Sequence, residues 1–97
     1  MESLIITAIK EKKILSFSYS GLHRVIEPHI YGLNDGIAQL LGYQIRGSSN
    51  SGSVPDWRRF SLAMMQNLQI LNEPFPGRRS FPSGKHSKWD RQILIVE

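Results

Sequence analysis

The feature that most constrains this 97-residue sequence is a polar–apolar alternation with a period of two, broken by short turn signals. It is clearest at Leu15, Phe17 and Tyr19, which alternate with serines before Ser20-Gly21. A period of two places successive side chains on opposite faces of a strand, so this segment predicts a half-buried strand followed by a hairpin turn. The chain is therefore expected to consist mainly of antiparallel strands.

The same signals recur along the chain. Residues 23–33 are rich in β-branched and aromatic side chains and predict a second strand, which ends at Asp35-Gly36, a pair that tolerates the positive φ of a tight hairpin. Three more strands are predicted at 37–45, 57–65 and 67–71, with a flexible serine- and glycine-rich loop at 47–56. Pro28 cannot donate to a ladder, so the second strand should lie at an edge, or be bulged or bent there.

The two ends of the chain differ from this central part. At the N-terminus, Ile5, Ala8 and Ile9 have the spacing of one helical face, and Ser3 is the predicted N-cap of a short helix over 2–13. Residues 74–97 form a predicted arm that is interrupted by proline and glycine and ends in the apolar run 93–96.

The apolar run 93–96 is expected to be a strand that pairs either with an edge of its own sheet or with a second copy of the chain. We favour the second copy, in a homodimer, because a basic arm can reach across a two-fold axis without disturbing a closed barrel. The predicted fold class is thus mainly β: residues 1–73 form a helix and a small five-stranded barrel, and residues 74–97 form an arm ending in a strand.

Composition limits the classes of function. An apolar content of 40% with 21% charged residues is typical of a globular domain, and the absence of cysteine excludes disulfides, thiolate nucleophiles and cysteine metal sites. No apolar run approaches the roughly 20 residues that span a bilayer, so we expect a cytoplasmic protein with no membrane partner. The net charge of +4 is concentrated in residues 74–97, which favours either an anionic partner or simply a solvated terminus.

The sequence gives no positive sign of catalysis. His23 and His29 lie six residues apart with Glu27 as the only nearby carboxylate, so we expect surface or rim histidines and no zinc site. No phosphate-binding loop, dinucleotide fingerprint or nucleophile elbow is present. The chain is therefore predicted to be no enzyme and to need no cofactor.

Arginines near the ends of three predicted strands are more informative. Strand ends of a small barrel cluster in space, and a guanidinium group binds phosphate or carboxylate with two parallel hydrogen bonds. Tyr31, Tyr43 and Trp57 fall in the same segments and offer faces for base stacking. The equally weighted alternative is that Tyr43 and Trp57 pack the core or rim while the arginines solvate barrel edges. The predicted ligand site comprises Arg24, Tyr43, Arg46, Arg58 and Arg59.

Five segments follow one another within residues 5–79: AIKEKKILSFSYSG, Arg24 to Pro28, IAQLLGYQIR, RRFSLAMMQNLQIL and a closing EPF. Their order resembles the WYL domain, a bacterial regulatory module with an Sm-like (SH3-type) barrel. The chain departs from the family in two places. The signature tripeptide is replaced by Gln39-Leu40-Leu41, and Met64 stands in place of the second arginine of the fourth strand.

The resemblance implies a divergent, free-standing module that senses a ligand and catalyses nothing. Its expected ligand is single-stranded nucleic acid, a nucleotide or another small anion, in transcriptional or defence-related regulation. The alternative is a protein-interaction or dimerisation module whose ligand site has degenerated. Phosphate contacts weaken steeply with salt and strand pairing does not, so salt dependence separates the two.

Overall fold

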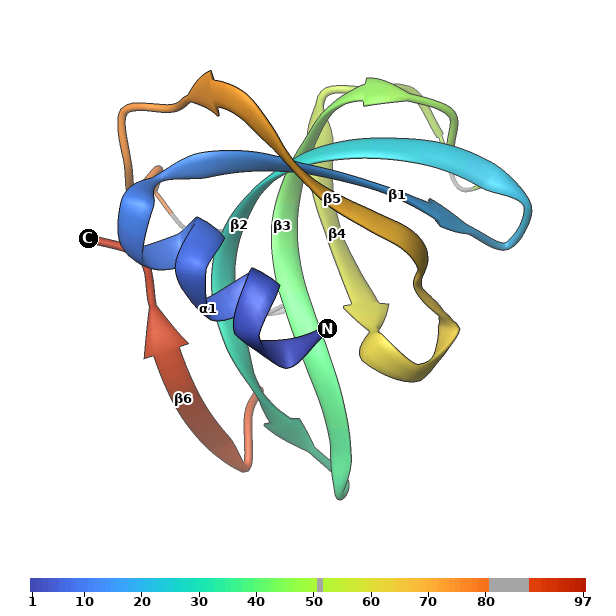
Figure 1. The fold of residues 1–97 in the computed structure, drawn as a ribbon. Coiled ribbons are helices and arrows are strands. Elements are labelled where there is room, and N and C mark those ends of the chain that lie inside the picture. The colour runs from blue at the N-terminus through green and yellow to red at the C-terminus, as the bar shows by residue number, and fades with distance from the viewer. Residues whose placement is uncertain (51, 81–87) are drawn as a thin grey trace.

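The computed structural model describes residues 1–50, 52–80 and 88–97, which form one helix and a six-stranded antiparallel sheet (Figure 1). The predicted mainly β class with an N-terminal helix is confirmed. None of these residues belongs to a helix that is long and apolar enough to cross a bilayer. In chain order the elements are α1 (Glu2–Glu11), β1 (Lys13–Tyr19), β2 (Leu22–Asn34), β3 (Ile37–Gly47), β4 (Asp56–Ser61), the 3-10 turn η1 (Leu62–Met64), β5 (Gln66–Pro74) and β6 (Arg91–Ile95).

Helix α1 packs against β1, β2 and β5. Its N-cap is Met1, with no side-chain hydrogen bond, so the prediction of Ser3 as the cap is wrong: Ser3 already lies inside the helix. The helix ends at Glu11 and is capped by Lys12, which adopts the left-handed conformation (φ 56°) and donates its N–H to the last turn. The predicted apolar face is buried, and consists of Ile5, Ala8 and Ile9.

Both predicted hairpins are confirmed. Ser20 and Gly21 connect β1 to β2, and Asp35 and Gly36 connect β2 to β3. Asp35 has φ 53° and Gly36 φ 76°, as the two central residues of a tight hairpin turn require.

Strand β2 lies in the centre of the sheet and changes partner at its proline. Residues 22–26 pair with β1, residues 30–33 pair with β6, and β3 runs along the other side of β2. The register against β3 shifts between Pro28 and Ile30. The register shift at Pro28 agrees with the predicted bulge or bend, whereas the predicted edge strand is wrong, because β2 has partners on both sides. The missing N–H of Pro28 is tolerated because the residue falls between the segments that pair with β1 and with β6.

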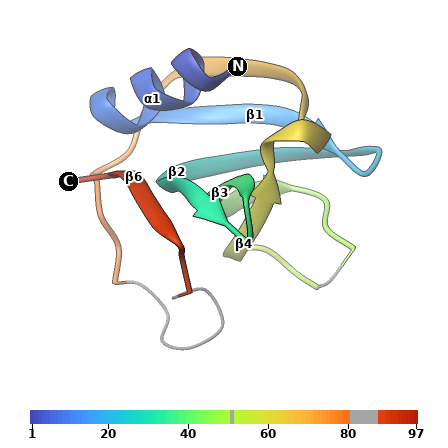
Figure 2. The same ribbon diagram turned by 90° about the horizontal axis from the view of Figure 1, so that it is seen from below.

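Strand β6 forms its ladder with β2 of the same chain, which is the first of the two pairings expected for the C-terminal run. Its backbone approaches so closely that a Cβ at Gly32 would collide with the carbonyl oxygen of Arg91 and the ring of Trp89. Figure 2 shows β6 beside β2, with its C-terminal end near α1.

The strand order is β4-β3-β2-β1-β5, with β6 attached to β2 off this path. Among the described residues no ladder joins β4 to β5. β4 is shorter than the predicted strand 57–65, which is wrong beyond Ser61, because the chain turns through η1 to enter β5. Met64 is consequently half exposed.

The hydrophobic core lies between α1 and the inward face of the sheet. Phe17 and Phe60 meet edge to face, with 4.9 Å between ring centroids. The alternation of apolar residues in the sequence predicts that Phe17, Leu41, Phe60 and Leu62 point inward. All four are buried, but Leu41 lies outside this core cluster. Its neighbour Leu40 pairs with Phe60 and takes the inward position. The prediction chose the wrong leucine because side-chain alternation alone does not distinguish two adjacent leucines.

Candidate anion-binding site

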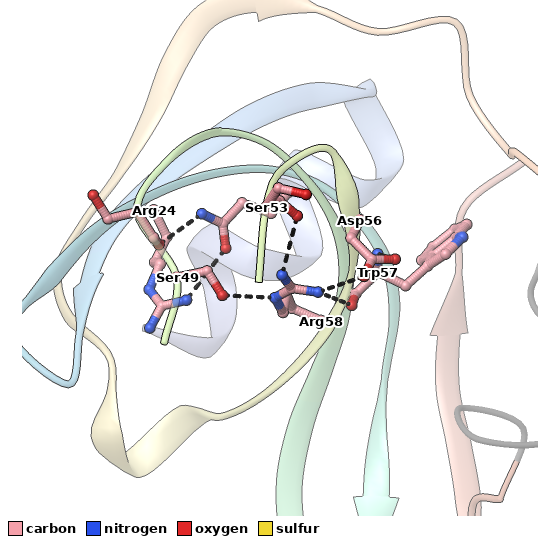
Figure 3. A network of polar contacts seen from close by, with 8 residues as sticks. Arg24, Ser49, Ser53, Asp56, Trp57 and Arg58 are labelled. Carbon is pink, nitrogen blue, oxygen red and sulfur yellow. Dashed lines mark hydrogen bonds and ion pairs between the residues drawn. The ribbon is translucent and has the colours of Figure 1, made fainter. Parts of the chain in front are cut away.

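Two of the predicted site arginines, Arg24 and Arg58, come together at the end of the sheet where β3 leads into the loop before β4 (Figure 3). Arg24 is the cross-strand partner of Phe17, on the inward face. Arg58 lies two residues before Phe60 on β4 and therefore shares that face. The inward face thus carries two guanidinium groups at one end of the aromatic core.

Arg24 is almost completely buried, with 4% of its surface exposed. Its Nη1 donates to Oε1 of Gln44 (3.3 Å) and its Nη2 to the carbonyl oxygen of Tyr19 (3.2 Å). The guanidinium carbon lies 5.7 Å and 5.8 Å from the ring centroids of Tyr19 and Phe60. Its Nε is buried with no hydrogen-bond partner among the described residues. A buried donor without a partner is costly, so this guanidinium retains capacity for an acceptor.

Arg58 is held by the loop that precedes it. Its Nε donates to Oγ of Ser49 (3.0 Å), Nη2 to the carbonyl oxygen of Ser53 (3.4 Å), and Nη1 to both Oδ2 of Asp56 (2.8 Å) and the carbonyl oxygen of Trp57 (3.0 Å). Figure 3 shows Ser49 between Arg24 and Arg58. The side chain of Arg58 is 12% exposed, whereas that of Asp56 is 59% exposed.

Arg24 is placed where its positive charge is disfavoured. Burial lowers the pKa of Arg24 most, and the positive charge of Arg58 lowers it further. Asp56 pairs with Arg58, but among the described residues no carboxylate pairs with Arg24. An anion placed between the two guanidinium groups would offset their repulsion and give the buried charge of Arg24 a partner.

Gln44 connects Arg24 to the loop. It is fully buried, and its Nε2 donates to the carbonyl oxygens of Arg46 (3.1 Å) and Ser48 (2.9 Å) while its Oε1 accepts from Arg24. Ser48 in turn donates its N–H to the carbonyl oxygen of His23 (2.9 Å). Sequence reasoning missed Gln44 and Ser49, because only the pairing of β3 with β2 and β4 brings them beside the arginines.

The other three predicted site residues lie elsewhere. Arg46 makes a two-point ion pair with Glu73 of β5 (3.0 and 2.9 Å), which raises the pKa of Arg46 and lowers that of Glu73. Arg59 points to the face opposite Arg58 and stacks on Trp89 (4.0 Å). Its Nη1 donates to Oε1 of Gln39 (3.2 Å) and to the carbonyl oxygen of Lys88 (2.8 Å).

Comparison with protein-family models, with curated proteins and with solved structures gives no match. Within residues 1–50, 52–80 and 88–97, no three His, Asp or Glu side chains gather closely enough to hold a metal ion.

Tyr43 lies on the opposite face from Gln44, beside Glu27 and Arg79. The sequence did not predict that these residues meet. The guanidinium of Arg79 stacks on the ring of Tyr43 at 4.3 Å and pairs with Glu27. His29 is fully buried beside them, so the interpretation as a surface or rim residue is wrong for His29, although His23 is indeed exposed. The available signal was Glu27 itself, a carboxylate between apolar neighbours in a strand, which requires a cationic partner when buried.

Proposed function

We propose that this chain is a non-enzymatic, cytoplasmic ligand-sensing module of the WYL type. Its Arg24–Arg58 pair binds a phosphate group of a nucleotide or of single-stranded nucleic acid, in transcriptional or defence-related regulation. The observation that carries the proposal is the pair itself: two largely buried guanidinium groups lie together, and among the described residues only Arg58 has a carboxylate partner while the Nε of Arg24 has no hydrogen-bond partner. Phosphate oxygens accept hydrogen bonds from such forks with good geometry.

The arrangement of the strands supports an Sm-like barrel as the setting for this site. The two strands at the ends of the path, β4 and β5, are consecutive in the chain and joined by η1. Closing the sheet between them would remove both edges. The site would then lie at one mouth of the barrel, where the loop after β3 begins.

Binding of a panel of nucleotides and short single-stranded DNA and RNA at two salt concentrations tests the proposal. Arg58→Ala should bind about ten- to a hundred-fold more weakly than the wild type, which corresponds to the loss of one charge-assisted hydrogen bond. Arg46→Ala is the matched control, because it removes the same charge from a half-exposed ion pair on another strand. Equal affinities of the wild type and Arg58→Ala, with Arg46→Ala unchanged, would refute the anion site.

A homodimer formed by exchange of β6 is a second candidate. The observation that favours it is the β6–β2 ladder, which joins the last strand of the chain to the middle of the sheet and could form equally with β2 of a second copy. Leu33 and Arg91 are partners in that ladder, and the chain contains no cysteine. Cysteines at both positions should cross-link on oxidation, with a denaturing gel showing a dimer if β6 is exchanged and a monomer if it is not.

A further inference from the structure

The face of the sheet opposite the Arg24–Arg58 pair contains a buried carboxylate. Glu27 of β2 is 5% exposed, and Tyr43 of β3 is its direct cross-strand partner. Tyr43 and Gln44 are consecutive residues of β3 and point to opposite faces. This second polar group is therefore separate from the candidate anion site.

The cation that compensates Glu27 comes from outside the sheet. Arg79 lies in the segment after β5, and its Nε and Nη2 donate to the two carboxylate oxygens of Glu27 (2.7 and 3.2 Å). Its guanidinium carbon lies 4.3 Å from the centroid of the Tyr43 ring. The hydrogen bond to Glu27 is the main cause that raises the pKa of Arg79. A carboxylate pair combined with an aromatic face selects the planar guanidinium over an ammonium group.

His29 adds a contact to the main chain of the same arginine. Its Nδ1 lies 2.9 Å from the carbonyl oxygen of Glu27, which can only accept, so Nδ1 carries the proton and Nε2 is an acceptor. The backbone N–H of Arg79 donates to that Nε2 (3.2 Å). Trp57 and Phe75 pack against the imidazole ring, with centroid distances of 4.8 and 5.7 Å. The ring is thereby fixed in the position that receives a peptide N–H.

The two sides of this contact are unequal. Glu27 and His29 are buried within the sheet, whereas the side chain of Arg79 remains 46% exposed on a segment without regular secondary structure. If that segment moved away, Glu27 would become a buried carboxylate without a counter-charge, which is a strongly unfavourable state. The sheet therefore forms the receptor, and the arginine is the part that can be replaced.

We propose that Glu27, Tyr43 and His29 form a recognition site for a peptide-borne arginine. Arg79 fills the site in cis, and an extended segment presenting an arginine from another chain binds it when Arg79 is displaced. Three contacts define the ligand: two carboxylate oxygens for the guanidinium fork, the Tyr43 ring for its face, and the imidazole nitrogen for the backbone N–H. A free guanidinium ion would satisfy the first two contacts and not the third.

Peptide binding to Arg79→Ala tests the site. The probe is the acetylated and amidated pentapeptide PGRRS, which copies residues 76–80, and its matched control is PGRKS, in which lysine replaces the second arginine. Calorimetric titration should show at least about tenfold tighter binding of PGRRS, because lysine cannot donate to both oxygens in a fork. The wild-type chain should bind PGRRS at least about tenfold more weakly than the variant, since the tethered Arg79 competes at high effective concentration.

Two further variants keep the test decisive. The double variant Arg79→Ala/Glu27→Gln should lose the preference for PGRRS, and Arg78→Ala should behave as the wild type. If Arg79→Ala does not fold, Arg79→Lys takes its place, because it keeps a positive charge opposite Glu27 without the fork. Equal binding of the two peptides to the vacated site, or an arginine preference that survives Glu27→Gln, would overturn the proposal.

Discussion

The two faces of the sheet each hold a guanidinium group against an aromatic ring, yet they place it in opposite electrostatic situations. On the inward face, Arg24 lies beside another arginine, and its pKa is lowered by burial and then by that neighbour. On the opposite face, here called the outward face, Arg79 forms an ion pair with Glu27, which raises the pKa of Arg79. Among the described residues, Arg24 thus has no carboxylate partner, whereas Arg79 donates to both oxygens of Glu27. The two proposals therefore assign a negatively charged ligand to the inward face and a positively charged one to the opposite face.

The largest effect is expected in the aromatic support of the inward face. Phe60 packs edge to face on Phe17 and Tyr19 and is 2% exposed, so Phe60→Ala should lower the free energy of unfolding by about 3–5 kcal/mol. Urea denaturation followed by circular dichroism measures the loss. A loss below about 1 kcal/mol would mean that the packing of Phe60 contributes little to the stability of the inward face.

The outward pair should respond unequally to removal of its two members. Arg79→Ala leaves Glu27 buried without a counter-charge, and we expect a loss of about 2–3 kcal/mol, below the usual range for a fully buried pair because Arg79 is half exposed. Glu27→Gln should cost about 1 kcal/mol, since water can solvate the released arginine. Denaturation of both variants at neutral pH gives the comparison. Equal losses would show that the pair is a symmetric surface ion pair.

The inward arginine should show the reverse behaviour. Arg24→Met removes a desolvated charge that is repelled by Arg58 but also the donor to the buried Oε1 of Gln44, so the two effects partly offset and stability should fall by no more than about 2 kcal/mol. Binding of the nucleotide or single strand should nevertheless be lost. Thermal melting and a binding titration on the same sample separate the two effects. A large destabilisation would indicate that Arg24 is a structural residue.

The smallest expected effect is a decrease in the free energy of unfolding at low pH, caused by His29 beside Glu27. Burial is the main cause that lowers the pKa of His29 below its ordinary value of 6.5. As the pH falls through 6.5, the unfolded chain takes up a proton that the folded chain does not, so the free energy of unfolding decreases until the lowered pKa is reached. The neighbouring charges are those of Glu27 on β2 and of Arg78 and Arg79 on the following segment.

Urea denaturation of the wild type and of His29→Gln between pH 7.5 and 5 isolates this contribution. The wild type should lose stability across the interval, and the variant should lose less. The contribution of the Glu73–Arg46 pair lies in a different window, because the pKa of Glu73 is lowered from 4.5. Parallel pH profiles of the two proteins would exclude His29 as the source.

Much of the fold followed from local signals in the sequence. The helix face of Ile5, Ala8 and Ile9, the two hairpins and the strand positions depend on side-chain periodicity and on residues that accept positive φ, and both act over a few neighbours. The errors also have local causes. Alternation does not distinguish the adjacent Leu40 and Leu41, so the wrong one was predicted to point inward. It also continues through residues 62–64, so it did not predict the turn η1.

The sequence by itself determined that this chain forms an antiparallel sheet with an N-terminal helix, and that its arginines lie near strand ends. Only the tertiary structure decided which arginines meet. Arg24 and Arg58 are brought together by the registers of three strands, and Arg79 reaches Glu27 across 52 positions of sequence. Charge pairing of this kind depends on distances between side chains from separate elements, and those distances are set by packing and by β2 changing its partner at Pro28.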